Sequence, residues 1–295
     1  MDTAEILKKV RQIEIQTNKL VSETFAGEYL SAFKGQGIEF AEVREYTPGD
    51  DVRAIDWNVT ARTGVPFIKK YNETRELTLM IACDVSASQR FGSVDKLKQE
   101  TAAELAALFA FSAMRNNDKV GLLLFSDKIE LFVPPKKGKK HILRLIRELV
   151  AFEPQSRGTD MALALKTLVQ VLRRQGILVL ISDYLSPLEQ FEKPLKLAAK
   201  KFDLIPVVVT DKLERSLPAC AACITVVDPE TGQEGTLALT ADTDKRLQED
   251  ALQRTEKLKE LFNPLKVEPI TVDTAQPAAD PVIAFFRRRT RQLKR

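Results

Sequence analysis

From residue 77 onward, the sequence alternates short apolar runs with longer amphipathic stretches. The apolar runs are typical of strands buried in a parallel sheet, and they lie at residues 77–83, 120–125, 177–181, 204–209 and 267–272. The stretches between them have helical periodicity and lie at residues 94–115, 141–152, 161–174, 187–201 and 243–262. This alternation predicts an α/β fold, with a doubly wound, mainly parallel sheet covered by helices on both faces.

The first 76 residues follow a different pattern. Ile6, Val10, Ile13 and Leu20 recur at near-helical spacing, which predicts an amphipathic N-terminal helix. Residues 27–76 consist of short β-like pieces separated by turn sequences. We therefore expect two parts: residues 1–76, an N-terminal helix with a small β-rich segment, and residues 77–295, an α/β domain that ends in a basic helix or tail.

Composition excludes several classes of protein. Hydrophobic residues at 44% and charged residues at 29% are ordinary for a globular chain. The longest apolar runs fall well short of the roughly 18 residues that a membrane span needs, and the N-terminus does not resemble a signal peptide. We therefore expect no transmembrane segment and a cytoplasmic location. A structural zinc site needs four sulfur or nitrogen ligands, and beside Cys220 and Cys223 only Cys83 and His141 could supply them, so we do not favour zinc and expect inert thiols.

The net charge of +4 comes from the C-terminus, because residues 287–295 contain six basic residues and no acidic one. Such a cluster can attract anions, but a solvated helix end is the simpler interpretation. No aromatic platform or recognition motif accompanies it. We therefore expect no specific nucleic-acid partner.

Oxygen-bearing side chains follow two of the predicted strands. The sequence Asp-Val-Ser-Ala-Ser comes directly after the first strand, an acidic residue follows the strand near 177–181, and a threonine precedes the helix at 161–174. Because the carboxyl ends of parallel strands meet at one edge of a sheet, we expect these side chains to converge. The candidate metal ligands are Asp84, Ser86, Ser88, Thr159 and Asp183.

Two carboxylates and three hydroxyls suit Mg²⁺ or Mn²⁺, which prefer oxygen ligands and often retain water. A metal held this way keeps a coordination position that can accept a carboxylate from a protein partner. This chemistry predicts metal-dependent binding with no catalytic residue. The alternative is that Asp84 and Thr159 are helix caps and that Ser86 and Ser88 are turn residues.

The five residues resemble the metal-ion-dependent adhesion site of von Willebrand factor A domains, over residues 77–211. Residues 35–53, with Ile55-Asp56-Trp57-Asn58 and Ala61-Arg62, resemble the signature of a prokaryotic family catalogued as domain of unknown function fifty-eight. Members are typically encoded beside MoxR-type AAA+ ATPases. The resemblance implies a von Willebrand factor A-like fold and a non-catalytic adaptor that works with such an ATPase in chaperone-like assembly or activation of other proteins.

The signature segment is dense in charged residues and also contains the aromatic residues Tyr46 and Trp57. It predicts either an internal salt-bridge network or a docking face for a protein partner with aromatic anchors. The candidate docking residues are Arg44, Tyr46, Arg53, Asp56, Trp57 and Arg62.

A metal-dependent phosphohydrolase is the alternative function, because an aspartate at a strand end with Mg²⁺ can serve phosphoryl transfer. Two features argue against it. Ser86 stands where aspartate-nucleophile phosphatases place a second aspartate, and the sequence offers no lysine in a recognisable role. ATP hydrolysis is less favoured still, since the chain has no GxxxxGK[ST] loop.

Overall fold

The computed structural model describes residues 3–20, 29, 32–33, 39–47, 50–52, 55–72, 76–93, 96–218, 220 and 222–293. The chain divides into two compact units, of which one comprises Met1–Tyr29 with Leu77–Arg295 and the other comprises Leu30–Glu76. The predicted boundary between residues 76 and 77 is present, but the N-terminal residues were wrongly grouped with the β-rich segment. The N-terminal helix belongs to the α/β unit because its apolar residues Val10 and Ile13 are buried there, where the helix contacts α4 and α5.

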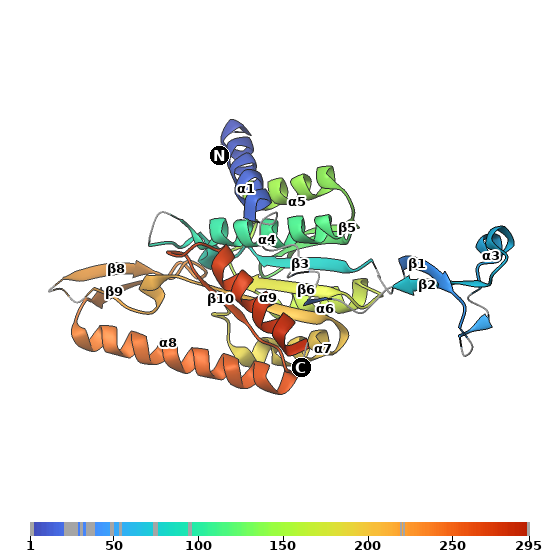
Figure 1. The fold of residues 1–295 in the computed structure, drawn as a ribbon. Helices are drawn as coiled ribbons and strands as arrows, with labels where there is room; N and C mark the ends of the chain where they lie inside the picture. The colour runs from blue at the N-terminus through green and yellow to red at the C-terminus, as the bar shows by residue number, and fades with distance from the viewer. Residues whose placement is uncertain are drawn as a thin grey trace. The chain divides into compact units, whose positions relative to one another are not determined.

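A six-stranded sheet forms the centre of the α/β unit (Figure 1). The strands are β3 (Thr78–Asp84), β4 (Lys119–Phe125), β5 (Ile129–Lys136), β6 (Ile177–Ser182), β7 (Asp203–Thr210) and β10 (Ile270–Asp273). Their order is β10-β7-β6-β3-β4-β5, and every neighbouring pair is parallel except β4 with β5. The predicted mainly parallel α/β sheet is confirmed.

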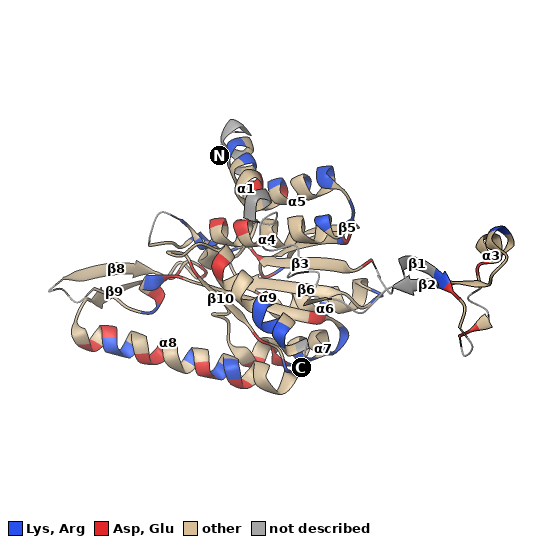
Figure 2. Ribbon diagram, viewed as in Figure 1, with Lys and Arg blue, Asp and Glu red and all other residues tan. Residues whose placement is uncertain are grey.

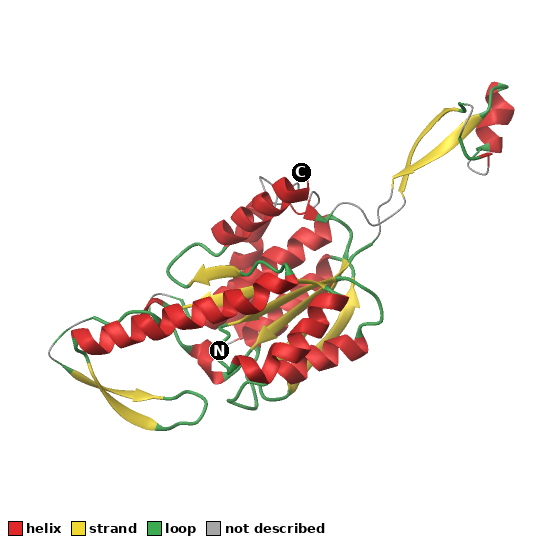
Figure 3. Cartoon of the chain, turned by 90° about the horizontal axis from the view of Figure 1, so that it is seen from below, coloured by secondary structure: helices red, strands yellow, loops and turns green. Residues whose placement is uncertain are grey.

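Helices cover both faces of this sheet (Figure 3). They are α1 (Thr3–Leu20), α4 (Lys98–Arg115), α5 (Lys139–Ala151), α6 (Met161–Val171), α7 (Leu188–Lys201), α8 (Ala241–Phe262) and α9 (Ala279–Leu293). Short 3-10 helices occur at η3 (Ala87–Arg90), η4 (Lys212–Glu214) and η5 (Asn263–Leu265). In the described residues, no helix combines the length and the apolar composition that crossing a membrane requires.

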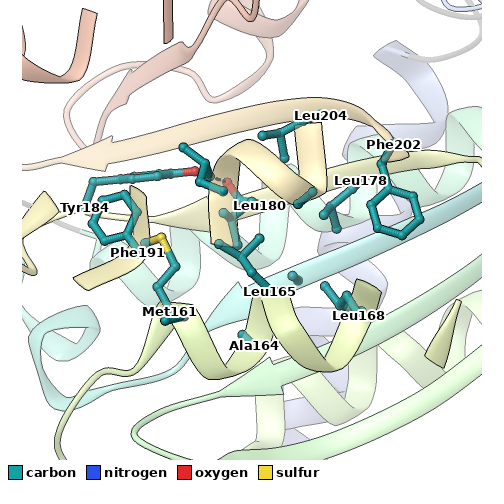
Figure 4. Close-up of a cluster of buried hydrophobic side chains, with 14 of the residues drawn as sticks. Met161, Ala164, Leu165, Leu168, Leu178, Leu180, Tyr184, Phe191, Phe202 and Leu204 are labelled. Carbon is teal, nitrogen blue, oxygen red and sulfur yellow. Dashed lines mark hydrogen bonds between the residues drawn. The ribbon is translucent and has the colours of Figure 1, made fainter. Parts of the chain in front are cut away.

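One face of the sheet packs against α6, α7 and the end of α8. Alternate strand residues supply this core, and Figure 4 shows Leu165 and Leu168 of α6 beside Leu178 and Leu180 of β6. Since all six residues of β6 are buried, the residues between these leucines face the opposite layer of helices. Burial on both sides is what makes this strand read as a continuous apolar run.

Two β elements were not predicted from the sequence. Strand β5 is an antiparallel edge strand that is only partly buried, and β8 (Cys223–Val227) pairs with β9 (Glu234–Ala238) in an exposed antiparallel hairpin. Neither has the buried apolar run that marks the central strands.

The C-terminal basic residues lie along α9 (Figure 2). Arg288 pairs with Glu268, and Arg289 pairs with Asp203. Both partners belong to the α/β unit, so these arginines hold α9 to its own fold.

The Leu30–Glu76 unit contains a two-stranded antiparallel sheet and one short helix. Strand β1 (Glu39–Glu45) pairs with β2 (Phe67–Asn72). Helix α3 (Trp57–Thr63) begins at Asp56, whose carboxylate accepts hydrogen bonds from two backbone N–H groups. It ends at Gly64, whose φ of 75° is a left-handed conformation that glycine adopts without strain.

Leu165→Ala should lower the free energy of unfolding by about 2–5 kcal/mol, because the leucine lies fully inside the core and its loss leaves a cavity. Denaturant unfolding followed by circular dichroism measures the change. Leu252→Ala on α8 is the matched control, since Leu252 is 63% exposed, and it should cost less than about 0.5 kcal/mol. Equal losses in the two variants would contradict this core.

Candidate functional site

Two buried carboxylates lie where the strand order of the sheet reverses. Asp84 is the last residue of β3, and Asp183 directly follows β6, the neighbouring strand. The strands that follow β3 and β6 in the chain, β4 and β7, lie on opposite sides of this pair. In α/β sheets, ligands bind at the carboxyl ends of strands whose following connections leave in opposite directions.

Hydroxyl groups join the two carboxylates in a continuous chain. The backbone N–H of Ser86 donates to Asp84 Oδ1 over 2.9 Å, and Ser86 Oγ lies 3.1 Å from Ser88 Oγ. Ser88 Oγ then donates to Asp183 Oδ2 over 2.7 Å. We call Asp84, Ser86, Ser88 and Asp183 the switch-point cluster. It contains four of the five predicted metal ligands, and all four are buried.

Burial makes the charged form of the cluster's carboxylates less stable. Burial and the nearby charge of Asp183 raise the pKa of Asp84 well above its usual range, although hydrogen bonds from Ser86 and Ser182 oppose the rise. Ser182 Oγ donates to Asp84 Oδ2 over 2.7 Å. Two carboxylates this close repel each other, and either a proton or a positive charge relieves the repulsion.

Lys98 supplies one positive charge from the start of α4. Its ammonium donates to Asp183 Oδ2 over 2.7 Å and to Glu214 Oε1 over 2.5 Å, and its side chain is fully buried. Burial opposes the charged form of Lys98, but the two carboxylates outweigh it and raise the pKa. Sequence reasoning missed both Lys98 and Glu214. Their spacing along the chain carries no signal, because α4 and η4 meet only in the folded sheet.

Thr159, the fifth predicted ligand, lies in the loop before α6. This loop is held against the Asp-Val-Ser-Ala-Ser turn by a hydrogen bond from the backbone N–H of Ala87 to the carbonyl of Arg157, 2.9 Å long. The Thr159 hydroxyl donates to Glu230 Oε1 over 2.8 Å. Among the described side chains, its hydrogen bond is therefore to Glu230, in the turn between β8 and β9, and not to the switch-point cluster.

The donor types of the cluster suit a small divalent cation. Ser86 Oγ and Ser88 Oγ are joined by a hydrogen bond of 3.1 Å. The donors are hard oxygens, the type that Mg²⁺ and Mn²⁺ prefer. No group of three or more His, Cys, Asp or Glu side chains is arranged for a metal ion within the described ranges.

The predicted docking residues have different roles within the Leu30–Glu76 unit. Arg44 donates to Asp50 over 2.7 Å and to Thr47 over 3.1 Å. Hydrogen bonds from the Thr47 backbone and from Arg44 lower the pKa of Asp50 to about 2. Asp56 is buried and caps α3. Arg44 and Asp56 therefore stabilise this unit, as the internal-network alternative predicts.

The remaining docking candidates lie on or near α3. Trp57 is 67% exposed at the start of the helix, and Arg62 is exposed in its last turn. Tyr46 is half-buried. Arg53 lies outside the described residues. An indole this exposed at a helix start is the feature of this unit most typical of an interface anchor.

None of the three cysteines nor the histidine belongs to the switch-point cluster. Burial raises the pKa of the Cys83 thiol well above its usual range. Cys220 and Cys223 are exposed and unbonded to each other. His141 Nε2 lies 2.9 Å from the carbonyl of Val120, so the ring anchors the start of α5.

Lys98→Met, studied in the presence of a metal chelator, should lower the free energy of unfolding by about 3–5 kcal/mol, because it leaves Asp183 and Glu214 buried without their ammonium. Denaturant unfolding measures the loss. Lys96→Met is the matched control, since Lys96 pairs with Glu104 at a partly exposed position and should cost less than about 1 kcal/mol. Retained stability in Lys98→Met would show that the ammonium does not balance these carboxylates.

Comparison with known proteins identifies relatives of this chain. A family described as "Protein of unknown function DUF58" matches residues 42–258. Uncharacterized proteins of Mycobacterium bovis and Mycobacterium tuberculosis are each 30% identical over 234 residues, which covers 79% of this chain and 73% of the relative.

Similar solved structures share little sequence with this chain. They include BatB from Bacteroides thetaiotaomicron, with 17% identity, a TM-score of 0.48, and coverage of 73% of this chain and 99% of that one. A von Willebrand factor type A protein from Catenulispora acidiphila has 11% identity, a TM-score of 0.43, and coverage of 74% and 43%. The fold described above rests on strand order and not on these alignments. Since the family match spans most of the sequence, the chain belongs to the DUF58 family of proteins of unknown function.

Proposed function

We propose that the chain is a non-catalytic protein-interaction module that binds Mg²⁺ or Mn²⁺ at the switch-point cluster and uses the ion to capture an acidic side chain of a protein partner. The observation that carries the proposal is the hydrogen-bonded row of buried carboxylates and hydroxyls from Asp84 to Asp183, with its two serine oxygens 3.1 Å apart. A row of this kind has the donor chemistry that a small divalent cation prefers.

The charge balance around the cluster supports a cation. Lys98 pairs with Asp183 and Glu214 and its charge acts on Glu230, while Asp84 lies close enough to Asp183 for their charges to interact. When all four carboxyl groups are ionised, three negative charges lack compensation from the Lys98 ammonium. Buried negative charge is costly unless a cation or hydrogen bonds offset it. A divalent ion would remove most of the excess.

Each residue has a distinct part in this proposal. Ser86 and Ser88 would offer hydroxyl oxygens to the ion, while Asp84 and Asp183 would offer carboxylate oxygens directly or through water. Ser182 and the Ser86 backbone N–H orient the Asp84 carboxylate. The bound ion would supply a Lewis-acidic position for a partner's carboxylate. Thr159 is the fifth candidate ligand.

For the alternative function, phosphohydrolysis, the structure removes one of the two arguments against it and supplies a different argument against it. A lysine does contact the cluster, contrary to the expectation from sequence, because Lys98 donates to Asp183. However, Lys98 is fully buried and committed to Asp183 and Glu214, so a phosphate could reach its ammonium only by breaking both ion pairs. Ser86 still occupies the position of the missing acid–base aspartate. Binding without turnover therefore remains the better-supported function.

An AAA+ ATPase of the MoxR type is the proposed partner in assembly or activation of other proteins. The resemblance of the signature segment supports this choice, and α3 offers a compact surface with an exposed indole. Exposed tryptophans of this kind often dominate binding energy at interfaces.

Titration calorimetry should detect Mg²⁺ and Mn²⁺ binding by the full chain. Asp84→Asn should weaken the affinity by about 100-fold or more, because it removes a charged ligand, while circular dichroism shows a retained fold. Asp127→Asn is the matched control, since Asp127 is an exposed carboxylate near the same sheet edge, and it should bind as the wild type does.

Two results would contradict the proposal. Failure of the wild type to bind either ion removes the metal dependence. Release of phosphate from p-nitrophenyl phosphate by the wild type with Mn²⁺, lost in Asp84→Asn, favours the phosphohydrolase instead.

Trp57→Ala should weaken binding to a purified MoxR-type ATPase from the same organism by about 2 kcal/mol or more, as loss of an aromatic anchor does. Biolayer interferometry measures the affinity. Val65→Ala, at another exposed apolar position of the same unit, serves as control. Equal affinities for Trp57→Ala and wild type would exclude the indole as the anchor.

A further inference from the structure

The hairpin formed by β8 and β9 presents an acidic side chain to the metal-candidate site. Two hydrogen bonds hold its turn, because Asp228 Oδ1 accepts from the backbone N–H groups of Glu230 and Thr231, at 2.9 and 3.3 Å. Gly232 closes the turn with a φ of 73°, which glycine adopts without strain. Figure 1 shows the hairpin beside the end of the sheet where β3 terminates.

The tip of the hairpin rests on the loop that carries Thr159. Glu230 Oε1 accepts the Thr159 hydroxyl over 2.8 Å, and a Cβ added at Gly232 would lie 3.8 Å from Arg157 Nη1. Glu230 is half-buried at this contact. The charges of Asp183 and Lys98 both act on its carboxyl group, which places that group in the field of the switch-point cluster.

Little apolar burial holds the hairpin in this position. Every residue of β8 is exposed, and four of the five residues of β9 are exposed. An element with few buried apolar contacts opens at low cost in free energy. The polar contact of Glu230 with Thr159 is thus a main attachment of the hairpin tip among the described residues.

We propose that Glu230 is an internal acidic ligand of this site, which occupies the position that the carboxylate of a protein partner would take. The inference rests on the proposed function and adds its regulation: the hairpin and the acidic partner exclude each other. The geometric basis is the 2.8 Å hydrogen bond that joins Glu230 Oε1 to Thr159 Oγ1, the hydroxyl of the fifth candidate ligand.

Tethering explains how one carboxylate can regulate the site. A ligand on the same chain has an effective concentration on the order of millimolar, so an external carboxylate present well below that concentration does not displace it. A partner must either bind with additional contacts or draw the hairpin away. The exposed strands of the hairpin offer a surface for the second route.

Water proton relaxation of the Mn²⁺-loaded full chain tests this inference, because it reports how many exchangeable waters the ion retains. Glu230→Gln should gain about one inner-sphere water relative to wild type, since an uncharged amide oxygen binds a hard cation more weakly than a carboxylate does and is replaced by water more easily. Added acetate should then lower the relaxivity of Glu230→Gln and leave that of the wild type unchanged.

Glu234→Gln is the control, because Glu234 is an exposed carboxylate of the same hairpin and should behave as the wild type does. Equal relaxivity and equal acetate response in Glu230→Gln and wild type, with Mn²⁺ bound to both, would overturn the internal ligand and leave the proposed function intact. A wild type that leaves all Mn²⁺ free, seen in its electron paramagnetic resonance signal, would overturn both.

Discussion

The placement of two carboxylates at the ends of adjacent buried strands is the constraint on which the α/β unit depends. Asp84 and Asp183 end up side by side because β3 and β6 are parallel neighbours in one sheet. Their burial raises the pKa of Asp84, and the fold answers with serine hydroxyls and with the ammonium of Lys98. The order of the strands places the two carboxylates side by side, and the start of α4 and the turn at η4 supply Lys98 and its second partner, Glu214.

This requirement also connects stability with function. A site satisfied completely by its own side chains has no use for a cation, whereas this one holds more carboxyl groups than positive charges. In the proposed function, the excess negative charge favours binding of a divalent ion, and the bound ion in turn attracts an acidic side chain of a partner. Glu230 belongs to the same balance, because its hairpin brings a further carboxylate to the loop of Thr159. In this proposal, the carboxylate of a partner and that of Glu230 compete for one position, so a partner binds only when the hairpin is released.

Much of the fold was predictable, and the reason is burial. Strands β3, β4, β6 and β7 are covered on both faces, so their residues are apolar without interruption and stand out in the sequence. The edge strand β5 and the β8–β9 hairpin lack that pattern because solvent reaches them. The N-terminal helix was predicted as an element, but its packing partners α4 and α5 lie far along the chain, so its assignment to the α/β unit was not predictable.

The sequence by itself determined the alternation of strands and helices and the oxygen chemistry of Asp84, Ser86, Ser88, Thr159 and Asp183, because both are local properties: an apolar period, and polar residues that follow a strand. Only the tertiary structure decided which groups meet those oxygens. Lys98, Glu214 and Glu230 come from α4, η4 and the β8–β9 turn, segments with no local pattern that links them. Long-range contacts between side chains depend on how layers pack, and the packing is set by the whole core.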